Sequence, residues 1–313
     1  MGHRSLAVRF AIMVAICLPV ASVAASGPAL AAVGSPAGAG RSVPVASRGG
    51  AAFAAIRAAG RKAAPWVPDS GPRPRSVTKT GLAAPRMSLA MRRANAEKQA
   101  IARTFLARMA RLAGSAGRCA KRPCRAGLPA ARDLKPTQRA QITNYFCGPA
   151  AVSEMLAQMN VAVGQRKSAR ELGTTQDGTA WSDSSGYPVP VVLNENQGIN
   201  DYVAVGLPWV PSRSELRTYE RDLVADINHG NGAPLAGDAY EVPGGPHLVG
   251  HPASQTIFHW FDIRGYRNSG AITDYEDSVH AASSIGWGAS VPAYSSLASS
   301  AIVDIVGARG YDW

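Results

Sequence analysis

The composition and charge of this chain change near residue 136, and this change limits where a folded domain can form. Residues 1–136 contain 23 Lys and Arg against 3 Asp and Glu, a net charge of +20, and are rich in Ala, Gly, Pro and Arg. Residues 137–313 contain 10 Lys and Arg against 18 Asp and Glu, a net charge of −8, and hold nearly all the Trp and Tyr. We therefore expect most of 32–86 to be disordered and 137–313 to form one hydrophobic core.

The first 31 residues have the pattern of a secretory signal peptide. Arg4 and Arg9 precede an apolar stretch at 10–25, and Ala29-Leu30-Ala31 is an A-x-A-like cleavage site. Pro19 interrupts the apolar stretch, which is too short for a membrane span. The sequence therefore predicts an exported protein, secreted, extracellular or cell-wall associated, with no stable membrane span once the signal is removed.

Because an exported protein meets an oxidising compartment, we can ask which of the four cysteines pair in disulfides. Cys17 leaves with the signal, and Cys119 and Cys124 are close enough in sequence to pair in an oxidising compartment. Cys147 then remains as an odd thiol, which an exported protein avoids unless the thiol is used. A zinc site is weakly supported because no His or fourth Cys lies nearby at ligand spacing. We expect neither a metal nor a cofactor.

The segment around Cys147 is typical of a nucleophile at the start of a helix. Pro149 suits the first helical turn. The apolar residues that follow recur at helical spacing: Val152, Met155, Leu156 and Met159. The unpaired N–H groups and positive dipole end of such a helix stabilise a thiolate. The alternative is a small apolar residue that caps a core helix.

Gln141 lies six residues before this cysteine and has two interpretations. Its side-chain amide can join the Cys147 N–H group in holding a tetrahedral oxyanion, and one such donor contributes roughly 3–4 kcal/mol to lowering the barrier. The alternative is an ordinary polar residue that precedes a helix.

A cysteine nucleophile needs a base, and His259 is the best candidate. It is the only one of five histidines in 137–313 that lies in a clear strand pattern, 257–266, on the same face as Phe261 and Ile263. The alternative is a core histidine without a catalytic role.

The turn that follows this strand identifies a carboxylate for the histidine. Arg267-Asn268-Ser269-Gly270 predicts a hairpin, so that Asp277 on the returning strand lies near His259 and Asp274 faces residues 262–263. Since an imidazole needs an acceptor to fix its tautomer, Asp277 is the predicted orienting residue.

Three other segments have recognisable patterns. Residues 87–112 form a basic amphipathic helix whose apolar stripe is Ile101, Phe105, Met109 and Leu112. Three interpretations of this helix stay open: it packs on its own domain, it belongs to a pro-segment, or it associates with the cell wall. We also predict a helix at 214–229 capped by Ser214, a short strand within 233–242 and a last helix at 295–308, with a loop-rich stretch after the Cys147 helix.

Four short motifs follow one another in an order typical of one peptidase family. They are Gln141-x5-Cys147-Gly148-Pro149-Ala150-Ala151, Leu172-Gly173-Thr174-Thr175, Asp177-Gly178-Thr179 and His259-Trp260-x4-Gly265-Tyr266. Together they resemble the bacteriocin-processing (double-glycine) peptidase-like group, family thirty-nine of the cysteine peptidases. Glu276-Asp277-Ser278 is similar to that family's Asp-Pro, with Ser278 in place of proline, and 243–256 is a Gly- and Pro-rich insertion.

The resemblance covers about 137–313 and implies a papain-like α+β fold, with the nucleophile at the N-terminus of a helix packed on an antiparallel sheet. It implies Cys147 as nucleophile, His259 as base, Asp277 as orienting residue and Gln141 as oxyanion donor. Family members fused to transporters cut leader peptides after a double glycine, and this sequence contains no transporter. The implied partner is a peptide or protein substrate.

The predicted organisation has four parts: a signal peptide at 1–31, a linker at 32–86, a basic helix with the Cys119 and Cys124 connector at 87–136, and a peptidase-like domain at 137–313. Two other functions stay open: a papain-like cell-wall amidase or endopeptidase, and a non-catalytic wall- or peptide-binding module. The basic half suits an anionic cell-wall polymer. We expect no nucleic acid partner, because the protein is exported and that half lacks aromatic residues for stacking.

Overall fold

A mixed α+β arrangement of six helices around one antiparallel sheet makes up the part of the chain that the computed structural model describes, residues 85–116, 127–184 and 186–313. The helices are α1 (Leu89–Ala116), α2 (Cys147–Gln158), α3 (Gln165–Glu171), α4 (Pro188–Asn196), α5 (Arg213–Ile227) and α6 (Ser299–Ile305). The strands are β1 (Arg132–Asp133), β2 (Ala204–Gly206), β3 (Leu235–Glu241), β4 (Ile257–Arg267), β5 (Ile272–Glu276), β6 (Tyr294–Ala298) and β7 (Gly310–Asp312). The predicted signal peptide, nearly all of the linker, and Cys119 and Cys124 lie outside the described residues.

The sheet has seven strands in the order β2-β7-β3-β4-β5-β6, and β1 pairs with the far end of β4. Every pair of neighbours is antiparallel. The last strand of the chain, β7, lies between β2 and β3. The predicted α+β class with an antiparallel sheet is therefore confirmed.

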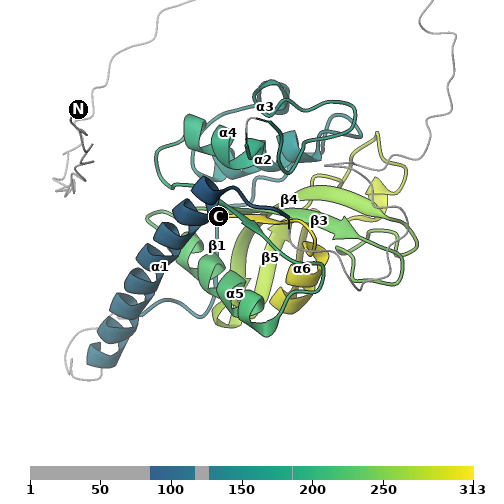
Figure 1. Cartoon of the computed structure of the whole chain (residues 1–313). Helices are drawn as coiled ribbons and strands as arrows, with labels where there is room; N and C mark the ends of the chain where they lie inside the picture. The colour runs from purple at the N-terminus through teal and green to yellow at the C-terminus, as the bar shows by residue number, and fades with distance from the viewer. Residues whose placement is uncertain (1–84, 117–126, 185) are drawn as a thin grey trace, which may run out of the picture. The chain divides into compact units, whose positions relative to one another are not determined.

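Helices cover both faces of this sheet (Figure 1). One apolar core combines α2, α4 and Leu172, the residue after α3, with Ala236 of β3 and Trp260 of β4. The other core lies between the opposite face and α5 and α6, and it contains Phe261 and Ile263 of β4. Since consecutive residues of a strand point to opposite faces, β4 contributes to both cores and is buried along nearly its whole length.

The strand and hairpin predictions agree with the structure except in register. β4 and β5 are joined by a short 3-10 turn at Asn268–Gly270, as expected. The turn itself sets a register different from the predicted one, so that Asp274 faces Gly265 and not residues 262–263. Further along the ladder, a bulge between Ile263 and Gly265 shifts the pairing by one residue. Asp274 instead accepts a hydrogen bond from Arg267 Nε at 3.0 Å.

Other boundaries differ from the sequence predictions. Helix α5 is capped by Ser212, whose side chain forms a capping box with Glu215, and not by Ser214. The segment predicted as one helix at 295–308 begins with β6, because pairing with β5 overrides its helical pattern. The stretch predicted as loop-rich contains α3 and α4, which are too short to give a clear periodicity.

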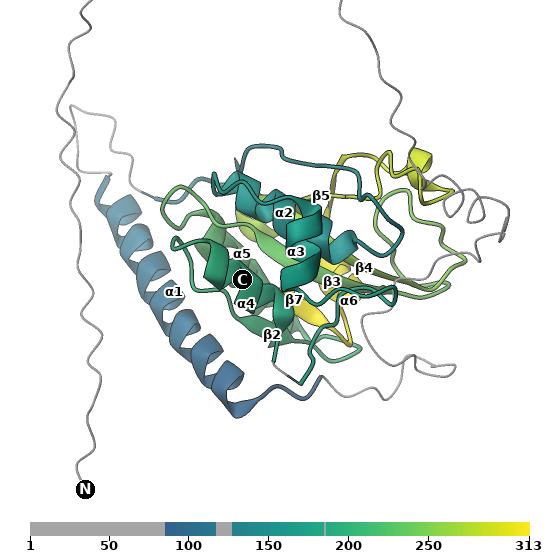
Figure 2. The same cartoon turned by 90° about the horizontal axis from the view of Figure 1, so that it is seen from above.

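Helix α1 contacts α5 and β2, and in Figure 2 it runs along the edge of the fold. The predicted stripe is wrong in detail: Ile101 is 65% exposed, whereas Ala102 is buried and Met91 packs against both cores. On this packed face, Lys98 Nζ lies 2.8 Å from Asp226 Oδ2 and 4.5 Å from the centre of the Trp313 ring. These contacts favour the interpretation of α1 as a helix packed on its own domain.

None of the described helices combines the length and the apolar character that a membrane span requires.

The Lys98–Asp226 pair predicts how firmly α1 is held. Lys98→Met keeps the apolar stem of the side chain but leaves the Asp226 carboxylate buried with Asn200 as its remaining side-chain partner. We expect the free energy of unfolding to fall by about 3 kcal/mol in a denaturant titration, the cost of breaking a buried ion pair from one side. Arg103→Met, at an exposed position of the same helix, is the control. Equal stability of the two variants would contradict the role given to this pair.

Candidate active site

Cys147 is the first residue of α2, as predicted, and it is 1% exposed. The side chain of the preceding Phe146 forms no cap, and Pro149 has no N–H group, so the start of the helix keeps backbone donors at Cys147 and Gly148. A Cβ atom added to Gly148 would lie 2.3 Å from Thr179 Oγ1. The loop that contains Thr179 therefore packs directly against the start of α2, and glycine is required there for space.

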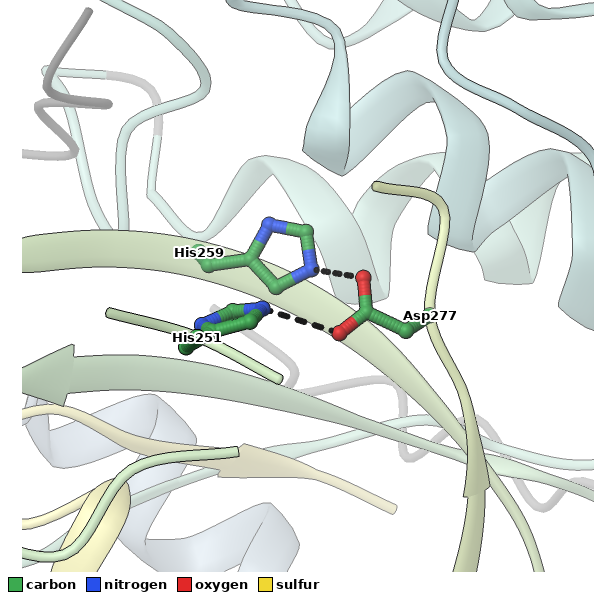
Figure 3. A group of neighbouring side chains, drawn as sticks. All are labelled: His251, His259 and Asp277. Atoms are coloured by element: carbon green, nitrogen blue, oxygen red, sulfur yellow. Dashed lines mark hydrogen bonds and ion pairs between the residues drawn. The ribbon is translucent and has the colours of Figure 1, made fainter. Parts of the chain in front are cut away.

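His259 of β4 and Asp277, which follows β5, are joined by a hydrogen bond of 3.1 Å from His259 Nε2 to Asp277 Oδ1 (Figure 3). Both side chains are fully buried. Although the β4–β5 ladder ends at Glu276, the carboxylate still reaches the imidazole across the end of the hairpin. The structure thus brings the predicted base and orienting residue into direct contact.

The imidazole of His259 also interacts with the Cys147 thiol. Burial alone would lower the pKa of His259, but the Asp277 carboxylate and, to a smaller extent, the nearby Cys147 thiol raise it to about 10. His259 Nδ1 forms no hydrogen bond with the described residues. Since Nε2 is occupied by Asp277, Nδ1 is the nitrogen left to exchange a proton with the sulfur.

Gln141 is buried and belongs to the same neighbourhood. Its backbone N–H donates to Ser278 O at 2.8 Å, its side-chain oxygen accepts from Ser278 Oγ at 3.2 Å, and its side-chain nitrogen donates to Thr143 O at 2.8 Å. Ser278 thus ties Gln141 to the segment that carries Asp277. One amide hydrogen of Gln141 remains for an oxyanion, a role that stays a prediction.

Two residues of the site were missed by the sequence predictions: His251, in the Gly- and Pro-rich insertion, and Glu241, the last residue of β3. His251 Nε2 lies 3.0 Å from Asp277 Oδ2, and its Nδ1 lies 2.8 Å from Glu241 Oε2. Asp277 therefore lies between two imidazoles, and these hold its pKa well below the usual range despite a burial that acts to raise it (Figure 3). The sequence signal was weak: a carboxylate closing an apolar strand, followed ten residues later by a histidine.

Two groups of described side chains bring possible metal ligands together. The first is His251, His259 and Asp277, whose ligand atoms already bond to one another. The second is Glu154, Asp262 and Glu276, buried carboxylates on α2, β4 and β5. Neither of these groups of described residues includes Cys147.

Bound protons and backbone N–H donors stabilise the buried carboxyl groups of the second group. Thr137 N–H donates to Glu276 Oε1 at 2.8 Å and Arg139 N–H donates to Glu154 Oε1 at 2.7 Å. Burial raises the pKa of all three carboxyl groups, that of Glu276 to about 7. We infer that this carboxyl cluster (Glu154, Asp262, Glu276) retains protons in neutral solution.

A scan of protein-family models gives no match to this chain, and a search of curated proteins finds no similar sequence. Functional assignment therefore depends on the chemistry of the site itself.

The carboxyl cluster predicts a pH dependence of stability. Glu276 is protonated up to about pH 7 in the folded protein but only up to about pH 4.5 when unfolded, so its contribution is fully present below pH 4.5 and lost as the pH rises to 7. Between these pH values, the free energy of unfolding of the wild type falls by roughly 3 kcal/mol more than that of Glu276→Gln. Urea titrations in the presence of a chelator measure the difference. Parallel pH profiles of the two proteins would show that folding does not raise the pKa of Glu276.

Proposed function

We propose that this chain is a secreted, papain-like cysteine peptidase that hydrolyses peptide bonds through a Cys147–His259–Asp277 triad. The observation that carries the proposal is the buried His259 ring, which bonds to Asp277 through one nitrogen and interacts with the Cys147 thiol. These three residues come from α2, β4 and the end of β5, which are distant in sequence. Such convergence of a thiol, an imidazole and a carboxylate is the arrangement that nucleophilic catalysis requires.

The first half of the reaction forms an acyl-enzyme. In the resting pair, His259 Nδ1 already holds the proton that Cys147 Sγ has given up, and the thiolate attacks the carbonyl carbon of the scissile peptide bond. The Cys147 N–H group and the Gln141 amide donate to the oxyanion that develops. The tetrahedral intermediate collapses when the C–N bond breaks and His259 gives its proton to the leaving amine.

In the second half, water attacks the thioester and gives one of its protons to His259. The C–S bond then breaks, and the product leaves as a carboxylic acid that loses its proton to solvent. The proton on His259 then neutralises or pairs with the released thiolate. Asp277 remains ionised through both halves and holds the imidazole with its Nε2–H toward the carboxylate, which keeps Nδ1 directed to the sulfur.

The substrate needs a path to a sulfur that is almost fully buried. A hollow of about 400 Å³ lies beside Tyr145 and Phe146, the two residues before Cys147, and α3 contributes Arg166 and Arg170 to its wall. None of the described residues that line this hollow carries a carboxylate. We infer that the substrate enters here, with displacement of the loop that packs Thr179 against Gly148, and that acidic side chains near the scissile bond favour binding.

Two alternatives differ from this proposal in substrate or in turnover. A cell-wall amidase or endopeptidase would use the same triad on stem peptides and release muropeptides from purified wall. A wall- or peptide-binding module would retain the fold and hydrolyse nothing. In all three cases we propose that the protein is exported and that its basic half, residues 1–136, contacts an anionic wall polymer.

The nucleophile is tested with a thiol-directed covalent inhibitor and mass mapping of the modified residue. We expect Cys147 to be modified at pH 6 and peptide hydrolysis to be lost in parallel. Cys147→Ala removes both labelling and hydrolysis with a nearly unchanged melting temperature, because the smaller side chain still packs at the helix start. A protein that is unmodified at Cys147 and inactive on a broad peptide library would be the binding module.

The two arginines that line the hollow, Arg166 and Arg170, predict a substrate preference. Replacing both Arg166 and Arg170 by Gln should raise KM about tenfold for peptides with Asp or Glu near the scissile bond, since each partly exposed charge contact contributes about 0.5–1 kcal/mol. KM for neutral peptides is expected to stay unchanged. Lys167→Gln is the matched control on α3, because Lys167 pairs with Glu171 at 2.8 Å and does not line the hollow. Equal losses for acidic and neutral peptides would rule out this preference.

A further inference from the structure

We propose that His251, which bonds to Glu241, is a positioning residue that shares the Asp277 carboxylate with His259. It thereby sets how the proton is distributed between the Cys147 thiol and the His259 imidazole. This inference rests on the proposed function, because it assigns the second histidine a role in the same site. The Gly- and Pro-rich insertion at 243–256 is then a part of the active site and not a departure from it.

Hydrogen-bond geometry fixes the protonation of His251. Its Nε2 faces Asp277 Oδ2 at 3.0 Å and its Nδ1 faces Glu241 Oε2 at 2.8 Å. The pKa of Asp277 is lowered, so its carboxylate accepts and His251 Nε2 carries a proton. Although burial acts to lower the pKa of His251, the two neighbouring carboxyl groups raise it, which places a second proton on Nδ1. His251 is therefore a buried imidazolium between two carboxylates.

The same bonds prevent Asp277 from rotating. Its Oδ1 accepts from His259 Nε2 and from the Val279 N–H group at 2.9 Å, while its Oδ2 accepts from His251. Glu241 is fixed in turn, because its Oε1 accepts from the Leu248 N–H group at 2.8 Å. Each carboxylate oxygen along the series Glu241–His251–Asp277–His259 has a donor, which holds His259 in one orientation.

The insertion is anchored on both sides of His251. The Trp287 ring packs on the imidazole with ring centres 4.7 Å apart, and Val249 N–H donates to Tyr275 Oη at 2.9 Å. Gly250 has φ +86°, and a Cβ atom there would lie 2.5 Å from Ser290 O. A loop built this closely around one side chain delivers His251 to a defined position.

A positive charge at this position acts on the triad. The ring centres of His251 and His259 are 5.4 Å apart. His251 therefore weakens the hold of His259 on its proton and stabilises a thiolate at Cys147, whereas the carboxylates act in the opposite direction. The other ionisable groups that face the two rings are Glu241 on β3, Tyr275 on β5, Asp277 and, on α2, Glu154 and Cys147. Tyr275 is neutral because burial raises its pKa far above the usual value.

The test follows the rate of Cys147 alkylation by a small reagent as a function of pH, in the full chain, with mass mapping of the labelled residue. His251→Gln keeps a donor to Asp277 but removes the charge, and His251→Leu removes both. We expect the pH of half-maximal alkylation to rise by about one unit in both variants, and the plateau rate to fall about tenfold in His251→Leu alone. His247→Gln is the matched control: His247 lies in the same insertion and bonds only to the backbone oxygens of Gly245 and Gln255.

Several outcomes overturn the inference. Profiles of both His251 variants that coincide with those of the wild type and His247→Gln would show that His251 has no electrostatic influence on the thiol. A fall in melting temperature or in the fraction labelled, with an unshifted pH midpoint, would show a purely structural role. Failure of the proposed function is distinct, because the wild-type thiol itself would then alkylate only in alkaline solution. If His251→Leu does not fold, the midpoint in His251→Gln decides.

Discussion

The site depends on the hydrogen bonds that stabilise the buried Asp277 carboxylate. A carboxylate taken out of water is stable only when donors and positive charge surround it, and Asp277 meets this requirement with His259 on one oxygen and His251 on the other. The backbone of the same segment is held as well, since Gln138 Nε2 donates to Asp277 O at 3.0 Å. Removing either imidazole would leave Asp277 with incomplete compensation, so the two rings and the carboxylate form one unit.

A second buried layer lies along the elements that carry this unit. Glu154, Asp262 and Glu276 belong to the same helix, strand and hairpin arm as Cys147, His259 and Asp277, respectively. Because protons and backbone donors must satisfy these carboxyl groups, the relative positions of α2, β4 and β5 are tightly constrained. The carboxyl cluster and the site thus share three elements, whereas His251 and the loop that contains Thr179 contact Asp277 and the start of α2, respectively.

Local sequence patterns were sufficient to predict those parts of the site that lie within one helix, one strand or one hairpin. The helix that begins at Cys147, the strand of His259 and the return to Asp277 follow from periodicity and turn residues, and the structure has all three. The turn register that places Asp274 opposite Gly265, and the bulge beyond Gly265, were not predictable, because register depends on packing across the sheet.

Long-range contacts limited the rest of the prediction. The position of β7 between β2 and β3 joins segments more than seventy residues apart by number, and no local signal reports such pairing. His251 reaches Asp277 only because the insertion folds back over β5, and its neighbours in sequence are turn residues. The packed face of α1 was displaced from the predicted stripe because Lys98, a charged residue, lies on it and pairs with Asp226.

The most direct test of the account is the protonation of the His259 ring, which nitrogen-15 NMR of the imidazole measures in the folded wild type. An imidazolium that persists through neutral pH and titrates near pH 10 is the result that contacts with Asp277 and Cys147 require, and Cys147→Ala lowers this midpoint. A ring that is neutral at pH 7 and titrates near the ordinary value of about 6.5 would contradict the coupling of sulfur, imidazole and carboxylate.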